Sequence, residues 1–419
     1  MWYLAIPNIM PSRSERHQLL TNLDQLIKLL ASEESLLREN PQITSDIDEL
    51  MAIRTCVQVT RYLDVRKYLK QKRTMADLLF TYDDKGFKAE VRMDKESFIK
   101  IVDILGRHRV FHNNSRNAQT PVWIQCFVVF RRFGCNGNGN SIIRNAHHSG
   151  FSEGAVIKFT ERVVTSILSL QHLVIKWPDE RERKSIKQRF QTNFGIKGAV
   201  SIVDGTPAVL AQKPGIDGET YFSRKGIYCI NLQLLCDDRG FIRHFITGWP
   251  GSVFDNTVFE QARISRHPDQ YFSPGEFLLA DSGYALKLFC MVPYRQPYSN
   301  YPHNQIFNEL FSSARVKIEH VNGILKGRWG SLKGISTQVK KKRDFLKINR
   351  QIISCLVLHN ILLFLNDDWD TDDDDDDDDD EEGRNEDVAD PRQFVDSDEG
   401  AKQQRINVQN YCLDWYFNK

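Results

Sequence analysis

The stretch FLLADSGY, residues 277–284, most strongly limits the folds open to this 419-residue chain. Three apolar residues lead into Ala280 and Asp281, and a Ser-Gly pair follows at once. A short apolar run that ends at a turn signal predicts a buried strand. Asp281 would then lie where the strand leaves the core, at the end where open α/β sheets bind ligands. Taken alone, an Asp before Ser-Gly also fits a simple turn.

Strands and helices surround this stretch over residues 196–366. The expected elements, in order, are a strand ending at Asp204, strands over 227–236 and 241–249, a helix capped by Ser252, the strand ending at Asp281, and helices over 305–332 and 344–365. The two middle strands are joined by a predicted hairpin turn, Asp-Asp-Arg-Gly. This succession predicts an α/β domain with a mixed sheet flanked by helices.

The helix over 305–332 carries a polar face within an otherwise apolar pattern. Arg315, Glu319, Asn322 and Lys326 follow one another at spacings of four, three and four residues. Such spacings place side chains on one side of a helix. A glutamate on a largely buried helix needs a partner to offset its desolvation. Either Arg315 or a metal ion could supply it.

Two strand-end aspartates and one helical glutamate could therefore meet at one edge of the sheet. Asp204, Asp281 and Glu319 are hard oxygen donors, which suit Mg²⁺ or Mn²⁺. Two such ions can activate a water or a 3′-hydroxyl and stabilise the leaving oxygen in an attack on phosphate. Rigid elements are needed because ion spacing sets the reaction geometry.

Charge is distributed unevenly along the chain, although its formal net charge is only +1. Residues 367–419 hold 21 acidic and 5 basic residues, which leaves residues 1–366 with a net charge of +17. A basic body suits a polyanion such as DNA. The acidic tail, residues 367–419, is predicted to be disordered and could screen that body. The sequence has no long apolar window, so we expect no membrane association.

The part before residue 196 is expected to be helical. Residues 1–118 form a helical N-terminal region, 119–175 a helix-turn-helix-like domain and 176–195 a basic linker. A short helix, a glycine turn and a second helix capped by Ser152 support the helix-turn-helix. Its exposed DNA contacts would include Lys158 and Arg162. The same pattern also occurs in ordinary helical bundles.

Six motifs within residues 196–365 carry a family resemblance. They are SIVDGTP, DGETYFSRKGIYCINLQLLCD, GWPGSVFDNTVF, LLADSGYAL, and VKIEHVNGILKGRW followed by LHNILL. In this order they resemble the catalytic domain of Harbinger-type DDE transposases and the nucleases derived from them. The resemblance implies an RNase H-like fold and divalent-metal-dependent cutting and joining of DNA. It also implies a Myb-like DNA-binding partner protein, action in the nucleus and a homo-oligomer at DNA ends.

The resemblance also implies roles for particular residues. Asp204, Asp281 and Glu319 match the family's catalytic carboxylates, and Asp255 is either a fourth ligand or a residue that supports the ligands. The loop with Arg224 and Lys225 would lie by the active site, where these side chains either contact phosphate or are plain surface charge.

The chain departs from the family pattern at two positions. Pro207 and Phe254 stand where the family usually has histidine, which puts a substrate contact in doubt but removes no carboxylate. Lys340–Arg343 is a basic cluster that suits DNA, a nuclear localisation signal or a solvated surface.

Three function classes follow from these observations. A nuclease or transposase agrees with the complete carboxylate set. A domesticated DNA-binding or scaffold protein, which keeps the fold without cleavage, is the alternative. A hydrolase of small phosphates is disfavoured by the basic body and by the absence of a glycine-rich phosphate loop.

Overall fold

The computed structural model describes residues 15–37, 41–60, 79–114, 117–369 and 398–418. The chain divides into two compact units, Met1–Gln71 and Lys72–Lys419. The first unit is a hairpin of α1 (Glu15–Leu37) and α2 (Pro41–Val59), which pack against each other. None of the helices in the described ranges is long and apolar enough to cross a bilayer.

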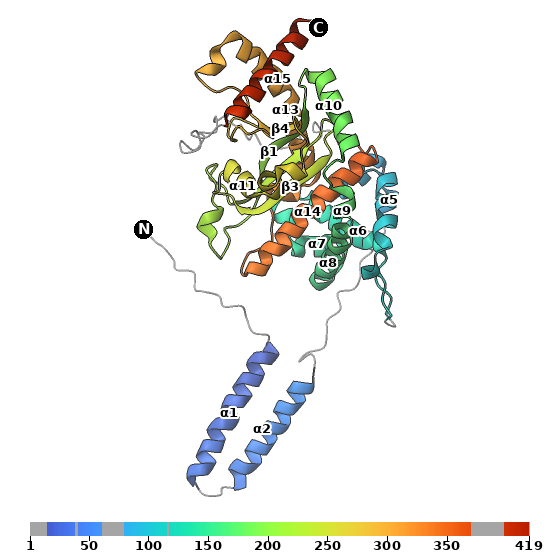
Figure 1. Ribbon diagram of the computed structural model, residues 1–419. Helices are drawn as coiled ribbons and strands as arrows, with labels where there is room; N and C mark the ends of the chain where they lie inside the picture. Colours follow the sequence, from blue (N-terminus) through green and yellow to red (C-terminus); the bar gives the residue numbers. More distant parts are fainter. Residues whose placement is uncertain (1–14, 38–40, 61–78, 115–116, 370–397, 419) are drawn as a thin grey trace, which may run out of the picture. The chain divides into compact units, whose positions relative to one another are not determined.

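A five-stranded mixed sheet forms the centre of the second unit (Figure 1). Its strands are β1 (Ala199–Val209), β2 (Cys229–Cys236), β3 (Ile242–Pro250), β4 (Phe277–Leu279) and β5 (Cys290–Met291). The spatial order is β3-β2-β1-β4-β5. The three long strands pair antiparallel, whereas β4 runs parallel to both β1 and β5. The α/β class predicted from the sequence is confirmed at this level.

Helices account for most of the remaining described chain. Before the sheet these are α4 (Asp84–Val91), α5 (Lys95–Gly106), α6 (Val122–Gly134), α7 (Ile142–Ser149), α8 (Glu153–Ser169), α9 (Gln171–Val174) and α10 (Glu180–Phe194). Within and after it come α11 (Asp255–Gln261), α12 (Arg263–Arg266), α13 (Pro302–Arg328), α14 (Lys342–Phe364) and α15 (Glu399–Phe417). Short 3₁₀ turns are η1 (Leu79–Thr81), η2 (Arg109–Phe111), η3 (Gly137–Asn140), η4 (Gly218–Tyr221), η5 (Pro268–Gln270), η6 (Tyr298–Asn300) and η7 (Gly330–Lys333).

The first strand is longer than the sequence predicts. Asp204 was expected at its end but lies in its middle, because pairing with β2 continues as far as Val209 opposite Cys229. Thr206 and Ala208 stay buried along this extension. The short edge strand β5 was also missed, since its two residues give no periodicity to detect.

The turn between β2 and β3 agrees with its prediction. The amide of Gly240 donates to the carbonyl of Asp237, which closes a tight turn. Asn360 of α14 holds β3 beside this turn, with its Oδ1 2.9 Å from the amide of Ile242 and its Nδ2 2.8 Å from the Ile242 carbonyl. Both Asn360 and the neighbouring His359 are buried, so this part of α14 faces the core.

The helices of the second unit that precede the sheet share one core with it. Phe98 of α5 contacts Phe130 of α6, which in turn packs against Trp329 at the end of α13. Trp329 is fully buried. The structure therefore divides the chain after residue 71, and no comparable division occurs at residue 118.

The predicted helix-turn-helix segment forms two successive helices, α7 and α8. Ser152 caps α8 as expected, because its hydroxyl accepts a hydrogen bond from the amide of Ala155. The second helix packs against α6, α7 and α14. Lys158 is exposed on α8 and Arg162 is half-buried.

The predicted basic linker, residues 176–195, is instead largely the helix α10, which packs on β1. Three of its basic side chains form ion pairs with acidic side chains that are themselves buried. Arg183 and Lys187 both pair with Glu276, at 2.7 and 2.6 Å, and Arg189 pairs with Asp238 at 2.6 Å. Partners far away in the sequence thus turn an apparent linker into a packed helix.

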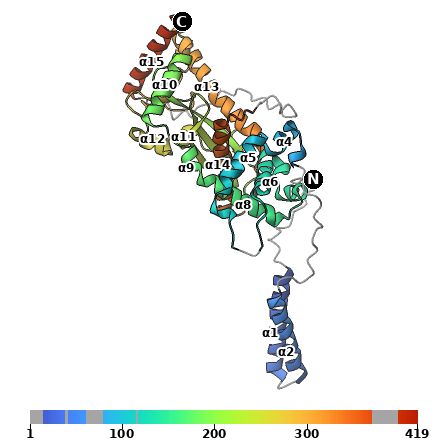
Figure 2. The ribbon, with the colours of Figure 1, turned by 90° about the vertical axis from the view of Figure 1, so that its right-hand side faces the viewer.

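The disorder predicted for residues 367–419 is wrong for the last part of the tail. Residues Glu399–Phe417 form α15, which lies beside α13 (Figure 2). Gln409 accepts a hydrogen bond from the Tyr294 hydroxyl at 2.9 Å, and Cys412 is fully buried. Asp367 is also buried, in an ion pair with Arg328. The aspartate run, Asp372–Asp380, lies outside the described residues.

Candidate active site

Asp204 faces α13 from the middle of β1. Its Oδ1 accepts a hydrogen bond from the Arg315 guanidinium at 3.2 Å, and its Oδ2 accepts one from the Asn322 side-chain amide at 3.0 Å. The predicted polar face of α13 therefore does point toward the sheet. The suggested partnership of Arg315 with Glu319 is corrected, because the guanidinium of Arg315 pairs with Asp204.

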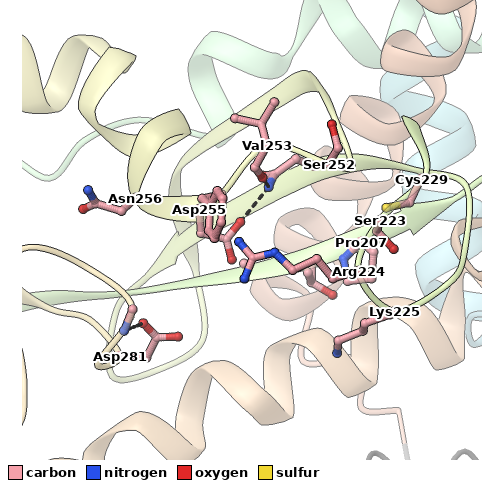
Figure 3. A pocket seen from close by; sticks show the side chains of 16 residues that line it. Pro207, Ser223, Arg224, Lys225, Cys229, Ser252, Val253, Asp255, Asn256 and Asp281 are labelled. Atoms are coloured by element: carbon pink, nitrogen blue, oxygen red, sulfur yellow. Dashed lines mark hydrogen bonds between the residues drawn. The ribbon is translucent and has the colours of Figure 1, made fainter. Parts of the chain in front are cut away.

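Asp281 comes from the strand next to β1. It lies two residues beyond the end of β4, which pairs in parallel with β1. Its Oδ1 accepts a hydrogen bond from the amide of Gly283 at 2.7 Å, so the turn fixes the carboxylate (Figure 3). This is the position that the sequence predicts for Asp281.

Asp255 is the first residue of α11 and packs directly over β1. A Cβ added to Gly205 would lie 2.2 Å from Asp255 Oδ2, so only glycine allows this approach. The residue before it, Phe254, is the N-cap, and it makes no side-chain capping bond. The expected cap Ser252 is therefore wrong, because α11 begins two residues later than a Ser252 cap requires.

Two amides of β2 hold Asp255, and the sequence analysis missed both. Asn231 donates to Asp255 Oδ1 at 2.6 Å, and Gln233 donates to the Asp255 carbonyl at 2.7 Å. Both amides are buried. Two polar residues spaced two apart in a buried strand were the available signal, because such residues share one face of the sheet.

The four carboxylates act on one another electrostatically. The pKa of Asp204 is raised from 3.8 to about 7, mainly by burial and in part by the charges of Asp281, Asp255 and Glu319, against the lowering effect of Arg315. Glu319 itself is exposed on α13. The structure thus brings the other three predicted carboxylates close enough to the half-buried Asp204 for their charges to act on it.

In the described residues, no three or more His, Cys, Asp or Glu side chains are grouped closely enough to hold a metal ion as they stand. Both oxygens of Asp204 accept hydrogen bonds from α13 instead. The donor set nevertheless fits a hard divalent cation, since it consists of carboxylates that repel one another.

A buried hydroxyl beside the carboxylates supports the same fit. Tyr284 is 1% exposed, and its hydroxyl has no hydrogen-bond partner among the described residues. Burial raises its pKa, as do the charges of Asp255, Asp281 and Asp204. A polar group left without a partner at this depth is costly, so it marks a place for a further polar ligand.

A cavity of about 180 Å³ opens beside Asp255 and Asp281. Arg224 and Lys225 line it from the loop before β2 (Figure 3). Their predicted position by the active site is thus the observed one. Lys158 and Arg162 are not among the residues that line this cavity, so the predicted DNA contacts form two separate sets.

A mixed sheet whose neighbouring strands present aspartates, with a further Asp and Glu from two helices, is the arrangement that the sequence analysis expects of a DDE-type domain. Residues 203–360 match the family model described as "DDE superfamily endonuclease", so the chain contains a domain that is similar to this family. The predicted resemblance to Harbinger-type transposases and their derived nucleases is thereby confirmed.

Curated relatives support this assignment. The chain is 27% identical over 236 residues to "Putative nuclease HARBI1" of Bos taurus, and the aligned region covers 56% of this chain and 66% of the relative. It is 26% identical to the protein of the same name from Homo sapiens, with the same coverage. "Protein ALP1-like" of Arabidopsis thaliana is 25% identical over 314 residues, 68% of this chain and 72% of the relative. The match thus spans just under two thirds of the mammalian relatives' length. No solved structure matches the chain significantly.

Proposed function

We propose that the protein is a divalent-metal-dependent endonuclease or transposase that cuts and joins DNA phosphodiester bonds. The observation that carries this proposal is the raised pKa of Asp204, which burial causes in the main and to which the charges of the nearby Asp281, Asp255 and Glu319 also contribute. Carboxylates gathered in this way bind a cation more favourably than they tolerate one another. Asp204, Asp281 and Glu319 would be the main ligands of Mg²⁺ or Mn²⁺, and Asp255 the fourth.

The bound ions would supply an activated water or 3′-hydroxyl and stabilise the leaving oxygen. The residues of the chain do the positioning. Arg315 and Asn322 orient Asp204, while Asn231 and Gln233 hold Asp255 at the start of α11. Ligands fixed by such partners keep their geometry. Arg224 and Lys225 at the cavity would contact the phosphates on either side of the cut.

Several finer features belong to the same proposal. Three antiparallel strands followed by two parallel ones, in the order β3-β2-β1-β4-β5, favour an RNase H-like fold. The α7–α8 pair would act as a helix-turn-helix, with Lys158 and Arg162 on DNA phosphates. Action in the nucleus, as a homo-oligomer on DNA ends and with a Myb-like partner protein, completes the proposal.

Nicking of supercoiled plasmid DNA tests the proposed activity. The wild type should convert the plasmid to the open circular form with Mg²⁺ or Mn²⁺, and chelation of the metal should stop it. Asp281→Ala should lower the rate by at least about a hundredfold, since it removes a ligand. Asp269→Ala is the matched control, because Asp269 is exposed and outside the site.

Two outcomes would contradict the proposed nuclease activity. Equal nicking by the wild type and Asp281→Ala would point to a contaminating enzyme. A wild type that binds DNA in a gel-shift assay but never nicks it would instead support the scaffold protein.

A further inference from the structure

An arginine and a phenylalanine are stacked at the mouth of the cavity. The guanidinium carbon of Arg224 lies 3.3 Å from the ring centroid of Phe254. Both residues line the cavity, together with Lys225, Asp255 and Asp281. The stacked pair therefore lies beside the carboxylates but is not part of the proposed set of metal ligands.

The chain holds the two members of this pair differently. Phe254 is the N-cap of α11 and directly precedes Asp255, a proposed metal ligand. A ligand stacked on the Phe254 ring would therefore lie next to the residue that precedes this metal ligand. Arg224 is exposed on a tight turn, in which the amide of Ser223 donates to Ile227 and the amide of Gly226 donates to Ser223. The guanidinium of Arg224 points toward Asp255, whereas Lys225 points away from it (Figure 3). The ring is thus half-buried at the start of a helix, and the guanidinium that covers it comes from an exposed side chain.

Stacking of a nucleobase on an aromatic ring is a stronger interaction than an exposed cation–π contact. A base can therefore replace the guanidinium on this ring. The displaced arginine remains within reach of the same nucleotide, and guanidinium groups pair well with phosphate. Phe254 has no polar side-chain atom, so it can offer a base only its face. Such a contact accepts any base, provided that the base is unpaired.

We propose that Phe254 is the stacking platform for an unpaired DNA base beside the scissile phosphodiester, and that Arg224 moves from the ring to that nucleotide's phosphate. This subsite rests on the proposed endonuclease function and specifies the form of its substrate. The DNA strand at the cut is locally unpaired, and the enzyme distinguishes it from intact duplex at this point.

Binding without a divalent metal tests the subsite separately from cleavage. The probe is a 20-nucleotide single-stranded oligothymidylate with one central 5-iodouracil, compared with the same strand paired to oligoadenylate. Fluorescence anisotropy gives the affinity, and photo-crosslinking with peptide mass spectrometry identifies the stacked residue. Phe254→Leu should weaken single-strand binding on the order of tenfold and abolish the crosslink, while duplex binding stays unchanged.

The two members of the pair should respond differently to salt. Arg224→Ala should make single-strand binding less dependent on salt, by the amount expected for the loss of about one phosphate contact. It should retain the crosslink to Phe254. Phe254→Leu should keep the salt slope. Phe254→Tyr should restore both affinity and crosslink, which shows that the loss is one of stacking and not of folding.

Phe222→Leu is the matched control, because Phe222 is exposed on the same turn but does not line the cavity. It should bind both probes as the wild type does. Equal binding by Phe254→Leu and the wild type, or a crosslink elsewhere, would overturn the subsite. Displacement of the oligonucleotide by an equal concentration of thymidine monophosphate would overturn DNA as its ligand. A wild type that never nicks DNA would contradict only the proposed nuclease activity, since the binding and crosslinking assays need no cleavage.

Discussion

At the scale of single residues, the site depends on a few polar groups that stand in energetically costly surroundings. Asp204 is half-buried beside three other acids and has a pKa raised to about 7. Tyr284 has a buried hydroxyl with no partner in the described chain. Both features cost folding stability unless a ligand compensates for them. Such local costs are typical of functional sites.

Tyr284→Phe tests whether this hydroxyl serves the proposed metal. The change should leave the free energy of unfolding the same or raise it by about 1 kcal/mol, because it removes an unsatisfied buried polar group. It should also weaken Mn²⁺ binding by about 10–100-fold, the usual effect of losing a group that orients metal ligands. Urea unfolding and titration calorimetry measure the two quantities.

Tyr298→Phe provides the comparison, since this tyrosine is 63% exposed and lies outside the cavity. A Tyr284→Phe protein that binds Mn²⁺ with wild-type affinity would exclude a metal-orienting role for the hydroxyl.

The sequence predicts the site at residue level better than it predicts the strand that carries it. Asp281 and the polar face of α13 were predicted correctly because each depends on local spacing. The full length of β1 was not, because Gly205 and Pro207 are local turn signals. Pairing with β2 overrides them, and Pro207 is tolerated as a strand residue opposite Asn231. The length of β1 is therefore set by its pairing with β2 and not by the local sequence.

At the scale of secondary-structure elements, the same limitation explains α10 and α15. Both segments are polar or charged, and composition therefore predicted a linker and a disordered tail. Their stabilising partners lie far away in the sequence. α10 is held by Glu276 and Asp238, and Tyr411 of α15 bonds to Gln191 of α10. Long-range contacts of this kind leave no periodic signal in either segment.

Gly195→Ala should reveal how firmly α15 is docked. Gly195 follows α10 with a φ of +70°, and an added Cβ would lie 2.6 Å from the Trp415 ring of α15. Left-handed backbone costs an alanine about 1 kcal/mol, and the clash with the ring adds about 1–3 kcal/mol. The free energy of unfolding, measured in urea, should fall by both amounts.

Gly275→Ala separates the two costs. Gly275 has a φ of +79° but open space around its missing side chain. It should lose only the backbone part, about 1 kcal/mol. Equal losses in the two variants would mean that Trp415 is not packed against Gly195 in solution.

At the scale of the whole molecule, charge separates the basic body from the acidic tail. Changing the nine aspartates Asp372–Asp380 to asparagine would raise the formal net charge from +1 to +10. If the run screens the basic body, non-specific duplex binding should tighten and become more salt-dependent. Anisotropy titrations over a range of salt concentrations measure both. Unchanged affinity at every salt concentration would exclude screening.

Whole-molecule stability should also fall in acid, and His359 is one identified cause. It lies buried in α14, where its Nε2–H donates to the carbonyl of Gly240 at 3.2 Å. Burial lowers its pKa from 6.5 to about 4, with a smaller lowering from the Arg328 charge and an opposing effect of the Gly240 bond. Arg328 is itself paired with Asp367. The folded state therefore holds this imidazole neutral at a pH where the unfolded chain protonates it.

The sign of the effect follows from proton linkage. Between pH 6.5 and 4 the unfolded state binds more protons at this site, so the stability present above pH 6.5 is lost as the pH falls. The loss amounts to at most about 3 kcal/mol, from 1.36 kcal/mol per unit of pKa. His359→Gln can keep a donor to Gly240 but cannot titrate, so its free energy of unfolding should decline less between pH 7 and 4. His303→Gln, at an exposed position on α13, should follow the wild-type curve. Parallel curves for all three proteins would show that His359 protonates as readily in the folded state as in the unfolded chain.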